Sequence, residues 1–180
     1  MNRLYSAVIL AMFVLHTGTA AASISEQRTS DIIDGLLPLA AFGTAYFKGD
    51  NEGEKQWLHG TVLHEVLYSV LVIGFNHTSL GTRPNGGSHS FPSGHAGFAF
   101  SQAGFLQERY GWKYGAPALV MATAVSYIRV DVGKHHWRDV IAGGALGYSC
   151  AWLTATPLNA THLAPIIGPH WLGIRYERSF

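Results

Sequence analysis

Five apolar segments recur along the chain, and short polar links separate them. They cover residues 32–47, 63–75, 96–106, 115–128 and 140–153. Their high content of Ala and Leu, and their lengths of roughly three or four helical turns, favour helices over strands. The pattern predicts an all-α fold, a compact bundle of about five or six helices.

The links between these segments are charged and contain glycine, as at residues 48–57 and 107–115. We expect loops at both places. Beyond Pro157 the pattern changes, and residues 170–180 alternate between polar and apolar side chains. This part of the chain is expected to form a short terminal strand or an extended tail.

The apolar segments are short for membrane spans. A spanning helix needs about 20 predominantly apolar residues, whereas these segments have 11 to 16. Polar residues or proline also interrupt them, at Asp34, Pro38, His64, Glu65 and Gln102. We therefore expect the buried helices of a compact domain that is soluble or peripherally attached. An integral membrane protein is the alternative, with the loops that hold Arg83, His95 and His135 on one outer side.

The first 22 residues have the organisation of a signal peptide. Arg3 supplies the positive start, residues 6–16 form the apolar centre, and small residues precede a cleavage site near Ala22. We predict cleavage there, leaving a single domain over residues 23–180. The protein would be exported, to the periplasm or to the outer face of the inner membrane. An uncleaved membrane helix is the alternative.

Composition narrows the function classes. The 180 residues are enough for one domain with a hydrophobic core and too few to expect two. A formal charge of +1, with scattered Lys and Arg, argues against nucleic acid as a partner. Cys150 is the single cysteine in the sequence, so an internal disulfide and a cysteine metal cluster are excluded. The ten histidines are the anomaly, and their positions decide what they mean.

Residues 91–100 read FPSGHAGFAF and combine a stiff loop with a helix start. Pro92 stiffens the entry, Ser93 is a typical N-cap, and Gly94 lets backbone N–H groups come close to a ligand. A helix that starts near His95 would direct its free N–H groups and positive dipole end into the loop, where an anion can bind. Taken alone, an ordinary capped helix start explains the same residues.

Two arginines flank this segment. Arg83, followed by Pro84, offers a permanently charged fork for phosphate oxygens. Arg129 precedes His135 by six residues, and Asp139 follows His135 by four. An aspartate at that spacing can hold the Nδ1–H of the imidazole and leave Nε2 as a nucleophile. A surface turn and a surface His–Asp pair are the simpler alternatives.

Together these residues suit phosphoryl transfer, which depends mainly on positioning and charge stabilisation. In this order they resemble the signature of the type 2 phosphatidic acid phosphatase superfamily, which includes acid phosphatases, lipid phosphate phosphatases and vanadium haloperoxidases. That signature is Lys-x6-Arg-Pro, then Pro-Ser-Gly-His, then Ser-Arg-x5-His-x3-Asp. The matching positions are residues 92–95 for the complete second part, Arg129, His135 and Asp139 for the third, and Arg83 and Pro84 for the first. The resemblance covers about residues 63–153.

The resemblance implies an all-helical core whose three motifs converge at one end, where the active site lies. His135 would attack phosphorus and form a phosphohistidine, and Asp139 would orient its ring. His95 would protonate the leaving oxygen and then activate water. The residues that would hold the phosphate oxygens are Arg83, Ser93, Gly94 and Arg129. No metal and no cofactor is implied.

The chain departs from the signature at two positions. Ile128 stands where Ser is usual, and Asn76 stands where the first motif has Lys. Asn76 stays a phosphate-binding candidate because its amide donates a hydrogen bond, but the lost charge-assisted contact is worth roughly 1.5–3 kcal/mol. We therefore expect a slower or differently selective enzyme. His136 is the rival of His135 as nucleophile, and the spacing to Asp139 favours His135.

The sequence thus predicts a metal-independent phosphatase that hydrolyses a phosphomonoester or a lipid (pyro)phosphate, with a membrane surface as a potential partner. A vanadate-dependent haloperoxidase is a second interpretation, although such enzymes are usually far larger. A third is a non-catalytic protein that binds a phospholipid head group, for which Asn76 is the only support.

Overall fold

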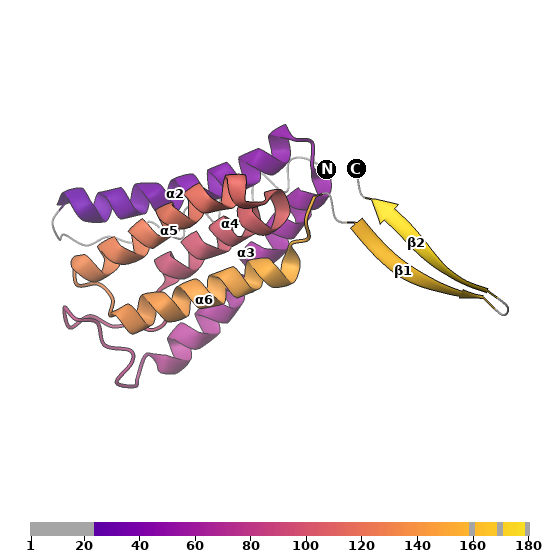
Figure 1. Cartoon of the computed structure of the whole chain (residues 1–180). Coiled ribbons are helices and arrows are strands. Elements are labelled where there is room, and N and C mark those ends of the chain that lie inside the picture. Colours follow the sequence, from indigo (N-terminus) through magenta and orange to yellow (C-terminus); the bar gives the residue numbers. More distant parts are fainter. Residues whose placement is uncertain (1–23, 159–160, 169–170, 179–180) are drawn as a thin grey trace.

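The computed structural model describes residues 24–158, 161–168 and 171–178. The predicted signal peptide at residues 1–22 lies outside these ranges. The described helices are α2 (Ile24–Phe47), α3 (Asn51–Phe75), α4 (Gly94–Tyr110), α5 (Trp112–Asp131) and α6 (Trp137–Thr154). They form an elongated bundle, so the predicted all-α class is confirmed for the body of the protein (Figure 1).

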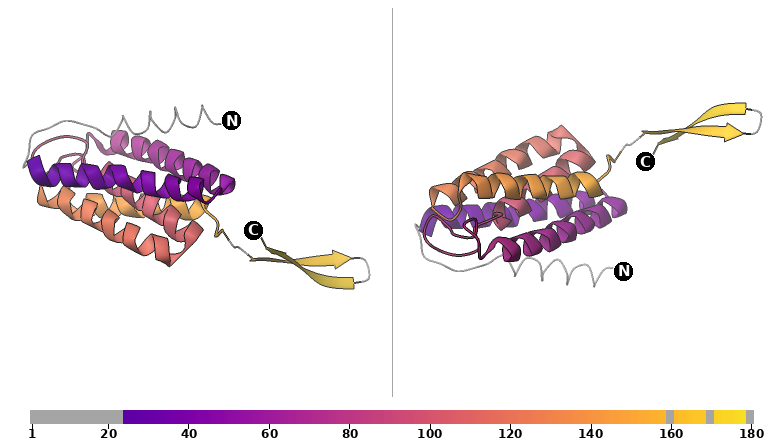
Figure 2. Two further views of the ribbon diagram at one scale, coloured as in Figure 1. Left: turned by 90° about the horizontal axis from the view of Figure 1, so that it is seen from above. Right: turned by 90° about the horizontal axis from the view of Figure 1, so that it is seen from below.

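The end of the chain forms a β-hairpin. Strands β1 (Thr161–Gly168) and β2 (Trp171–Arg178) pair antiparallel, with Thr161 opposite Arg178. The predicted terminal strand is confirmed as β2, whereas β1 was not predicted. The single domain over residues 23–180 stays a prediction. The hairpin stands apart from the helices (Figures 1 and 2).

The two links predicted as loops are largely helical, so that prediction is wrong. α3 begins at Asn51 because the Oδ1 atom of Asp50 accepts the N–H of Gly53 at 2.9 Å and caps the helix. Between α4 and α5 only Gly111 is non-helical, at φ +81°, a conformation that glycine adopts without strain. The helices have 17 to 25 residues, so the length argument against membrane spans also fails.

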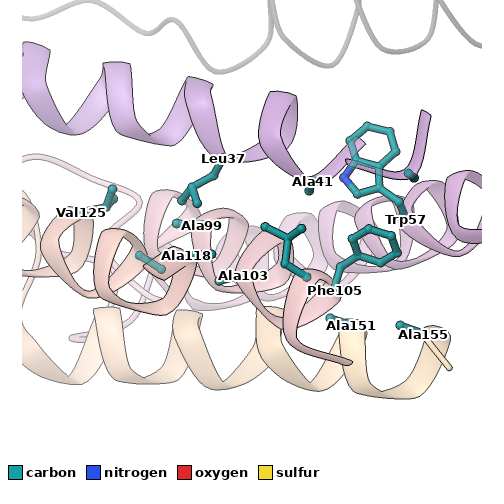
Figure 3. Packing of buried hydrophobic residues seen from close by; sticks show 13 residues of the cluster. Leu37, Ala41, Trp57, Ala99, Ala103, Phe105, Ala118, Val125, Ala151 and Ala155 are labelled. Carbon is teal, nitrogen blue, oxygen red and sulfur yellow. The ribbon is translucent and has the colours of Figure 1, made fainter. Parts of the chain in front are cut away.

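α4 is the central helix. It contacts each of the other four described helices, and twelve of its 17 residues are buried. Figure 3 shows the core around it, in which small side chains predominate and let neighbouring helices approach closely. The labelled residues are Leu37, Ala41, Trp57, Ala99, Ala103, Phe105, Ala118, Val125, Ala151 and Ala155.

Glycines allow α4 and α6 to touch through their backbones. A Cβ atom at Gly147 would overlap the carbonyl oxygen of Gly97, and one at Gly143 would overlap the carbonyl oxygen of Ser93. Any larger side chain at these positions would push the two helices apart. The contact therefore fixes the start of α4 against the start of α6.

Successive helices run in opposite directions, so their starts and finishes lie alternately at the two ends of the bundle. α2, α4 and α6 begin at the end where α3 and α5 finish, at the left of Figure 1. At the opposite end, Arg109 donates from Nη2 to Oδ1 of Asp50 at 2.6 Å and from Nε to Oδ2 at 2.8 Å. This bidentate pair ties α4 to the start of α3. The three motifs of the sequence all lie at the first end.

Candidate active site

His135 lies in the short turn between α5 and α6 and is buried, with 2% of its surface exposed. Its Nδ1 atom is 2.8 Å from the backbone carbonyl oxygen of Ser90 and 3.8 Å from Oδ2 of Asp139. A carbonyl oxygen only accepts, so Nδ1 carries the hydrogen and Nε2 holds the lone pair of the neutral ring. The predicted orientation of the imidazole thus involves a backbone atom as well as Asp139.

Burial and the neighbouring arginines together favour the neutral form of His135. Burial has the largest effect and lowers the pKa of the imidazole, while the carboxylate of Asp139 opposes it. The nearby guanidinium groups of Arg83 and Arg129 lower the pKa further, and the Ser90 carbonyl opposes them. The net result is a pKa below the usual value, so the nucleophilic form of the ring persists to lower pH.

Asp139 is fully buried in the first turn of α6, and its carboxylate both stabilises the start of this helix and lies near His135. Its Oδ2 atom accepts the hydroxyl of Ser90 at 2.5 Å and the backbone N–H of His136 at 2.8 Å. The second bond caps α6, because it satisfies a donor at the helix start. A carboxylate held in this way keeps one orientation.

His136 also contacts Asp139, with 3.3 Å between its Nδ1 atom and Oδ2. This distance is shorter than the 3.8 Å from His135. The side chain of His136 is 40% exposed, however, whereas that of His135 is 3% exposed. The interpretation of His135 as the nucleophile stays a prediction, supported by its burial and by the two nearby guanidinium groups.

The Pro-Ser-Gly-His segment starts α4 as predicted. Ser93 is the N-cap, and its Oγ atom accepts the N–H of Ala96 at 3.4 Å. The N–H of Ser93 donates to the carbonyl oxygen of Asp139 at 2.9 Å and ties this segment to α6. Gly94 is packed against the ring of Tyr68 from α3, where a Cβ atom would lie 2.9 Å from the phenol oxygen. The positive end of the α4 dipole is thereby held next to the His135 turn.

Two arginines reach this end of the bundle with unused donors. Arg83, in the loop after α3, donates from Nη2 to the carbonyl oxygen of His89 at 3.3 Å. Arg129, on the last turn of α5, is 4% exposed and donates from Nη1 to Oδ1 of Asp31 at 3.3 Å. Among the described residues, the Nε atoms of both arginines are buried without a hydrogen-bond partner. Guanidinium donors of this kind are suited to bind the oxygens of an anion.

His95 faces a residue that the sequence analysis did not identify. Its Nε2 atom is 3.4 Å from Oδ1 of Asp31, which belongs to α2. Asp31 precedes the first apolar segment of the sequence, and no motif points to it. Only the packing of α2 beside α4 and α5 brings this carboxylate to the site.

Asn76 does not occupy the place of a free cation. It caps the end of α3, and its Oδ1 atom accepts the N–H of His89 at 3.0 Å. The residue therefore closes the loop that carries Arg83, and its phosphate-binding role stays a prediction. His77, the neighbour of Asn76, is exposed, and Lys134, the neighbour of His135, is 6% exposed.

The site therefore combines two arginines with unpaired Nε donors, a helix N-terminus and two imidazoles at one end of the bundle. Such a set can hold a tetrahedral oxyanion and stabilise charge on its oxygens. It also places a neutral imidazole with a defined lone pair among the cations. This is the donor arrangement that phosphoryl transfer through a histidine needs.

A family model described as the PAP2 superfamily matches residues 39–161. This match takes in more than half of the chain and all three motifs. The chain belongs to the PAP2 superfamily. The resemblance seen in the sequence is thereby confirmed, whereas Asp31 lies before the matched region.

Curated relatives of this PAP2 chain match over shorter stretches. Lipid A 4'-phosphatase of Helicobacter pylori (strain J99) is 44% identical over 62 residues, 34% of this chain and 31% of that protein. Lipid A 1-phosphatase of the same strain is 31% identical over 87 residues, 48% of this chain and 46% of that protein. A putative phosphatidate phosphatase of Drosophila melanogaster is 33% identical over 94 residues, 45% of this chain and 24% of that protein. Each match spans less than half of the relative's length.

Two solved structures share the helical fold. The crystal structure of Aquifex aeolicus LpxE aligns with a TM-score of 0.61 and 23% identity, over 81% of this chain and 93% of that one. A transmembrane PAP2 type phosphatidylglycerolphosphate phosphatase from Bacillus subtilis aligns with a TM-score of 0.55 and 23% identity, over 86% and 85% of the two chains. At this level of identity the likeness concerns the fold alone.

Proposed function

We propose that this PAP2 chain is a metal-independent phosphatase that hydrolyses a phosphomonoester or a lipid (pyro)phosphate through a phosphohistidine intermediate. The observation that carries the proposal is the pair of guanidinium groups of Arg83 and Arg129, whose charges both act on the buried ring of His135 and whose buried Nε atoms have no hydrogen-bond partner among the described residues. A phosphate group between them would satisfy both donors and present phosphorus to the ring.

In the first step, Nε2 of His135 attacks phosphorus while the bond from phosphorus to the leaving oxygen breaks. His95 donates a proton to that oxygen, so an alcohol leaves and a phosphohistidine remains. Asp139 and the Ser90 carbonyl hold Nδ1–H and stabilise the ring as it gains positive charge.

In the second step, a water molecule attacks phosphorus and gives a proton to His95. The bond from phosphorus to Nε2 of His135 breaks, which releases inorganic phosphate and restores both rings. Arg83, Arg129, the hydroxyl of Ser93 and the N–H of Gly94 would hold the phosphate oxygens throughout, and the Asn76 amide would contribute at most one further donor.

A lipid phosphate is the proposed substrate class. The names of the matched relatives, two lipid A phosphatases and a putative phosphatidate phosphatase, support this class without fixing the lipid. The protein's own surface supports it independently. Large apolar side chains are exposed on all described helices except α4, among them Ile32, Leu36, Val66, Val70, Val120, Ile141 and Trp152.

We further propose that the bundle is embedded in a membrane, in place of the soluble domain favoured by the sequence. Among the described residues, α3 is the one helix that is long and apolar enough to cross a bilayer, and only 22% of its apolar window is buried inside the protein. Its exposed residues Val62, Val66, Val70 and Ile73 follow one helical face. An apolar face of this kind is stable in lipid and unfavourable in water. The site would then lie at one membrane surface.

The nucleophile test compares His135→Asn with His136→Asn, two identical changes at adjacent residues. In purified, detergent-solubilised protein we expect His135→Asn to lower phosphate release by at least about a thousandfold, because the covalent route is closed. His136→Asn should retain most of the activity. Wild-type turnover should be unchanged by a chelator such as EDTA.

The result is checked by trapping. Acid-labile, base-stable phosphate should appear on wild-type protein after brief exposure to labelled substrate and be absent from His135→Asn. Full activity of His135→Asn with loss of activity in His136→Asn would exchange the two roles. Tight binding of phosphate without turnover of any ester by the wild-type protein would reject the phosphatase proposal in favour of a binding protein.

A further inference from the structure

The carboxylate of Asp31 lies close to two residues of the candidate site, His95 and Arg129. One oxygen, Oδ1, lies 3.4 Å from Nε2 of His95 and 3.3 Å from Nη1 of Arg129. The three residues come from α2, α4 and α5, so tertiary packing alone brings them together. The side chain of Asp31 is 43% exposed, whereas that of Arg129 is 5% exposed.

We propose that Asp31 is a positioning residue for His95 in the phosphatase reaction. This inference rests on the proposed function, because it assigns a partner to the residue that would act there as general acid. The PAP2 match begins at residue 39, so the family motifs assign no role to Asp31.

The contact fixes which ring nitrogen of His95 does which task. A carboxylate accepts hydrogen bonds, so Nε2 carries a hydrogen that faces Asp31. In the cationic ring Nδ1 also carries a hydrogen, and this is the proton passed to the leaving oxygen. The neutral ring that remains keeps its Nε2–H on Asp31 and presents the lone pair of Nδ1 to the incoming water. Asp31 itself neither gains nor loses a proton.

The contact of His95 with Asp31 resembles the contact of His135 with Asp139. His135 has its Nδ1 near Asp139, and His95 has its Nε2 near Asp31. A carboxylate thus lies beside each imidazole, where it orients the ring and favours the cationic form over the neutral one. The cation is the form that a general acid must hold before the first step.

The same oxygen balances the buried charge of Arg129. A guanidinium with 4% exposure needs a counter-charge when no substrate is bound. Asp31 supplies it through Nη1 and leaves the Nε–H of Arg129 unpaired. A phosphate can therefore bind at Nε without displacing Asp31 from His95.

The test is Asp31→Asn, which keeps the size of the side chain and removes its charge. Two substrates are compared, a short-chain phosphatidic acid whose leaving alkoxide needs protonation and p-nitrophenyl phosphate whose leaving phenolate does not. For phosphatidic acid we expect kcat to fall about 10- to 100-fold, at or below the lower end of the usual contribution of a general acid, because His95 itself remains in place. For p-nitrophenyl phosphate we expect less than about a threefold fall, and KM should not rise for either substrate.

Asp131→Asn is the matched control, since Asp131 is exposed at the end of α5 and makes the same change of charge. It should leave both substrates within about twofold of wild type. Melting temperatures in detergent establish that each variant is folded. If Asp31→Asn is unstable, Asp31→Ser gives the same comparison.

Three outcomes would overturn the inference. Equal losses with both substrates would mean a general structural defect, and wild-type kinetics with both would mean that Asp31 has no role. A rise in kcat/KM for both would mean that the carboxylate competes with the phosphate of the substrate. Failure of the proposed function would give a different result, because the wild-type protein would then release no phosphate from either ester.

Discussion

At the scale of single residues, Ser90 connects the two members of the proposed nucleophilic pair. Its hydroxyl donates to Asp139 and its carbonyl oxygen accepts from His135, and the residue is fully buried. The first contact is made by the side chain and the second by the backbone. A substitution at this position therefore separates the two effects.

Ser90→Ala should weaken the site without abolishing it. A buried hydrogen bond to a charged group is worth about 1.5–3 kcal/mol, so Asp139 should lose that much stabilisation. A loss of about 1.4 kcal/mol in the transition state is tenfold in rate, and we expect kcat/KM to fall about tenfold with a lower melting temperature. Phosphate release and thermal unfolding in detergent measure both effects.

Ser79→Ala, an exposed position in the same loop, is the control and should match wild type. A Ser90→Ala protein with wild-type rate and wild-type melting temperature would remove Ser90 from the site.

The residues that the sequence identified are those whose spacing carries the information. Arg129 lies at the end of α5, His135 in the turn that follows and Asp139 at the start of α6, so eleven residues of sequence contain all three. Ser90 and Asp31 could not be found in this way. Ser90 resembles any loop serine, and Asp31 comes to the site through the packing of a helix distant in sequence from both motifs.

At the scale of elements, the contact between α4 and α6 positions the site. The N–H of Ser93 bonds to the carbonyl of Asp139 only because glycines let the two backbones meet. We expect Gly147→Ala to be destabilising, by about 1–3 kcal/mol or more, because the added Cβ overlaps the backbone of Gly97 and no side-chain movement can relieve it. The melting temperature and kcat/KM should both fall.

Gly74→Ala is the matched control, since a Cβ there would meet no described atom within 4 Å. It should be neutral or stabilising, because alanine favours helix by up to about 1 kcal/mol over glycine. Equal melting temperatures for the two variants would show that the helices separate without cost.

The five described helices follow the order of the five predicted apolar segments, whereas the ends of the helices were not predicted. Residues 51–57 and 107–110 are helical although their charge and glycine content are typical of loops. In both places the polar residues serve the helix ends, since Asp50 caps α3 and pairs with Arg109 of α4. A contact between residues 59 positions apart cannot be read from local composition.

At the scale of the whole molecule, the exposed apolar faces separate a membrane protein from a soluble one. Val66 is 56% exposed near the middle of α3. In water, Val66→Lys would be nearly neutral, as most exposed substitutions are. In a bilayer it would cost about 2.5–3.5 kcal/mol, so we expect a large loss of folded, membrane-inserted protein.

Wild-type protein should remain in the membrane pellet after alkaline carbonate and dissolve in dodecyl maltoside. Asn51→Lys, an exposed position at the first residue of α3, is the control and should insert normally. Recovery of wild-type protein and of Val66→Lys in the aqueous fraction, both folded, would contradict the membrane proposal.

The acceptor for Nδ1–H of His135 is a backbone carbonyl oxygen, so substitution of side chains cannot remove this hydrogen bond. Every residue type at position 90 has the same backbone carbonyl oxygen. Substitutions there therefore test the contact of the side chain with Asp139 and leave the contact of the backbone with His135 untested. Replacing the amide that carries this oxygen by an ester, through semisynthesis, weakens the acceptor while leaving all side chains in place. The position of the backbone at Ser90 thus determines which nitrogen of the proposed nucleophile carries the hydrogen.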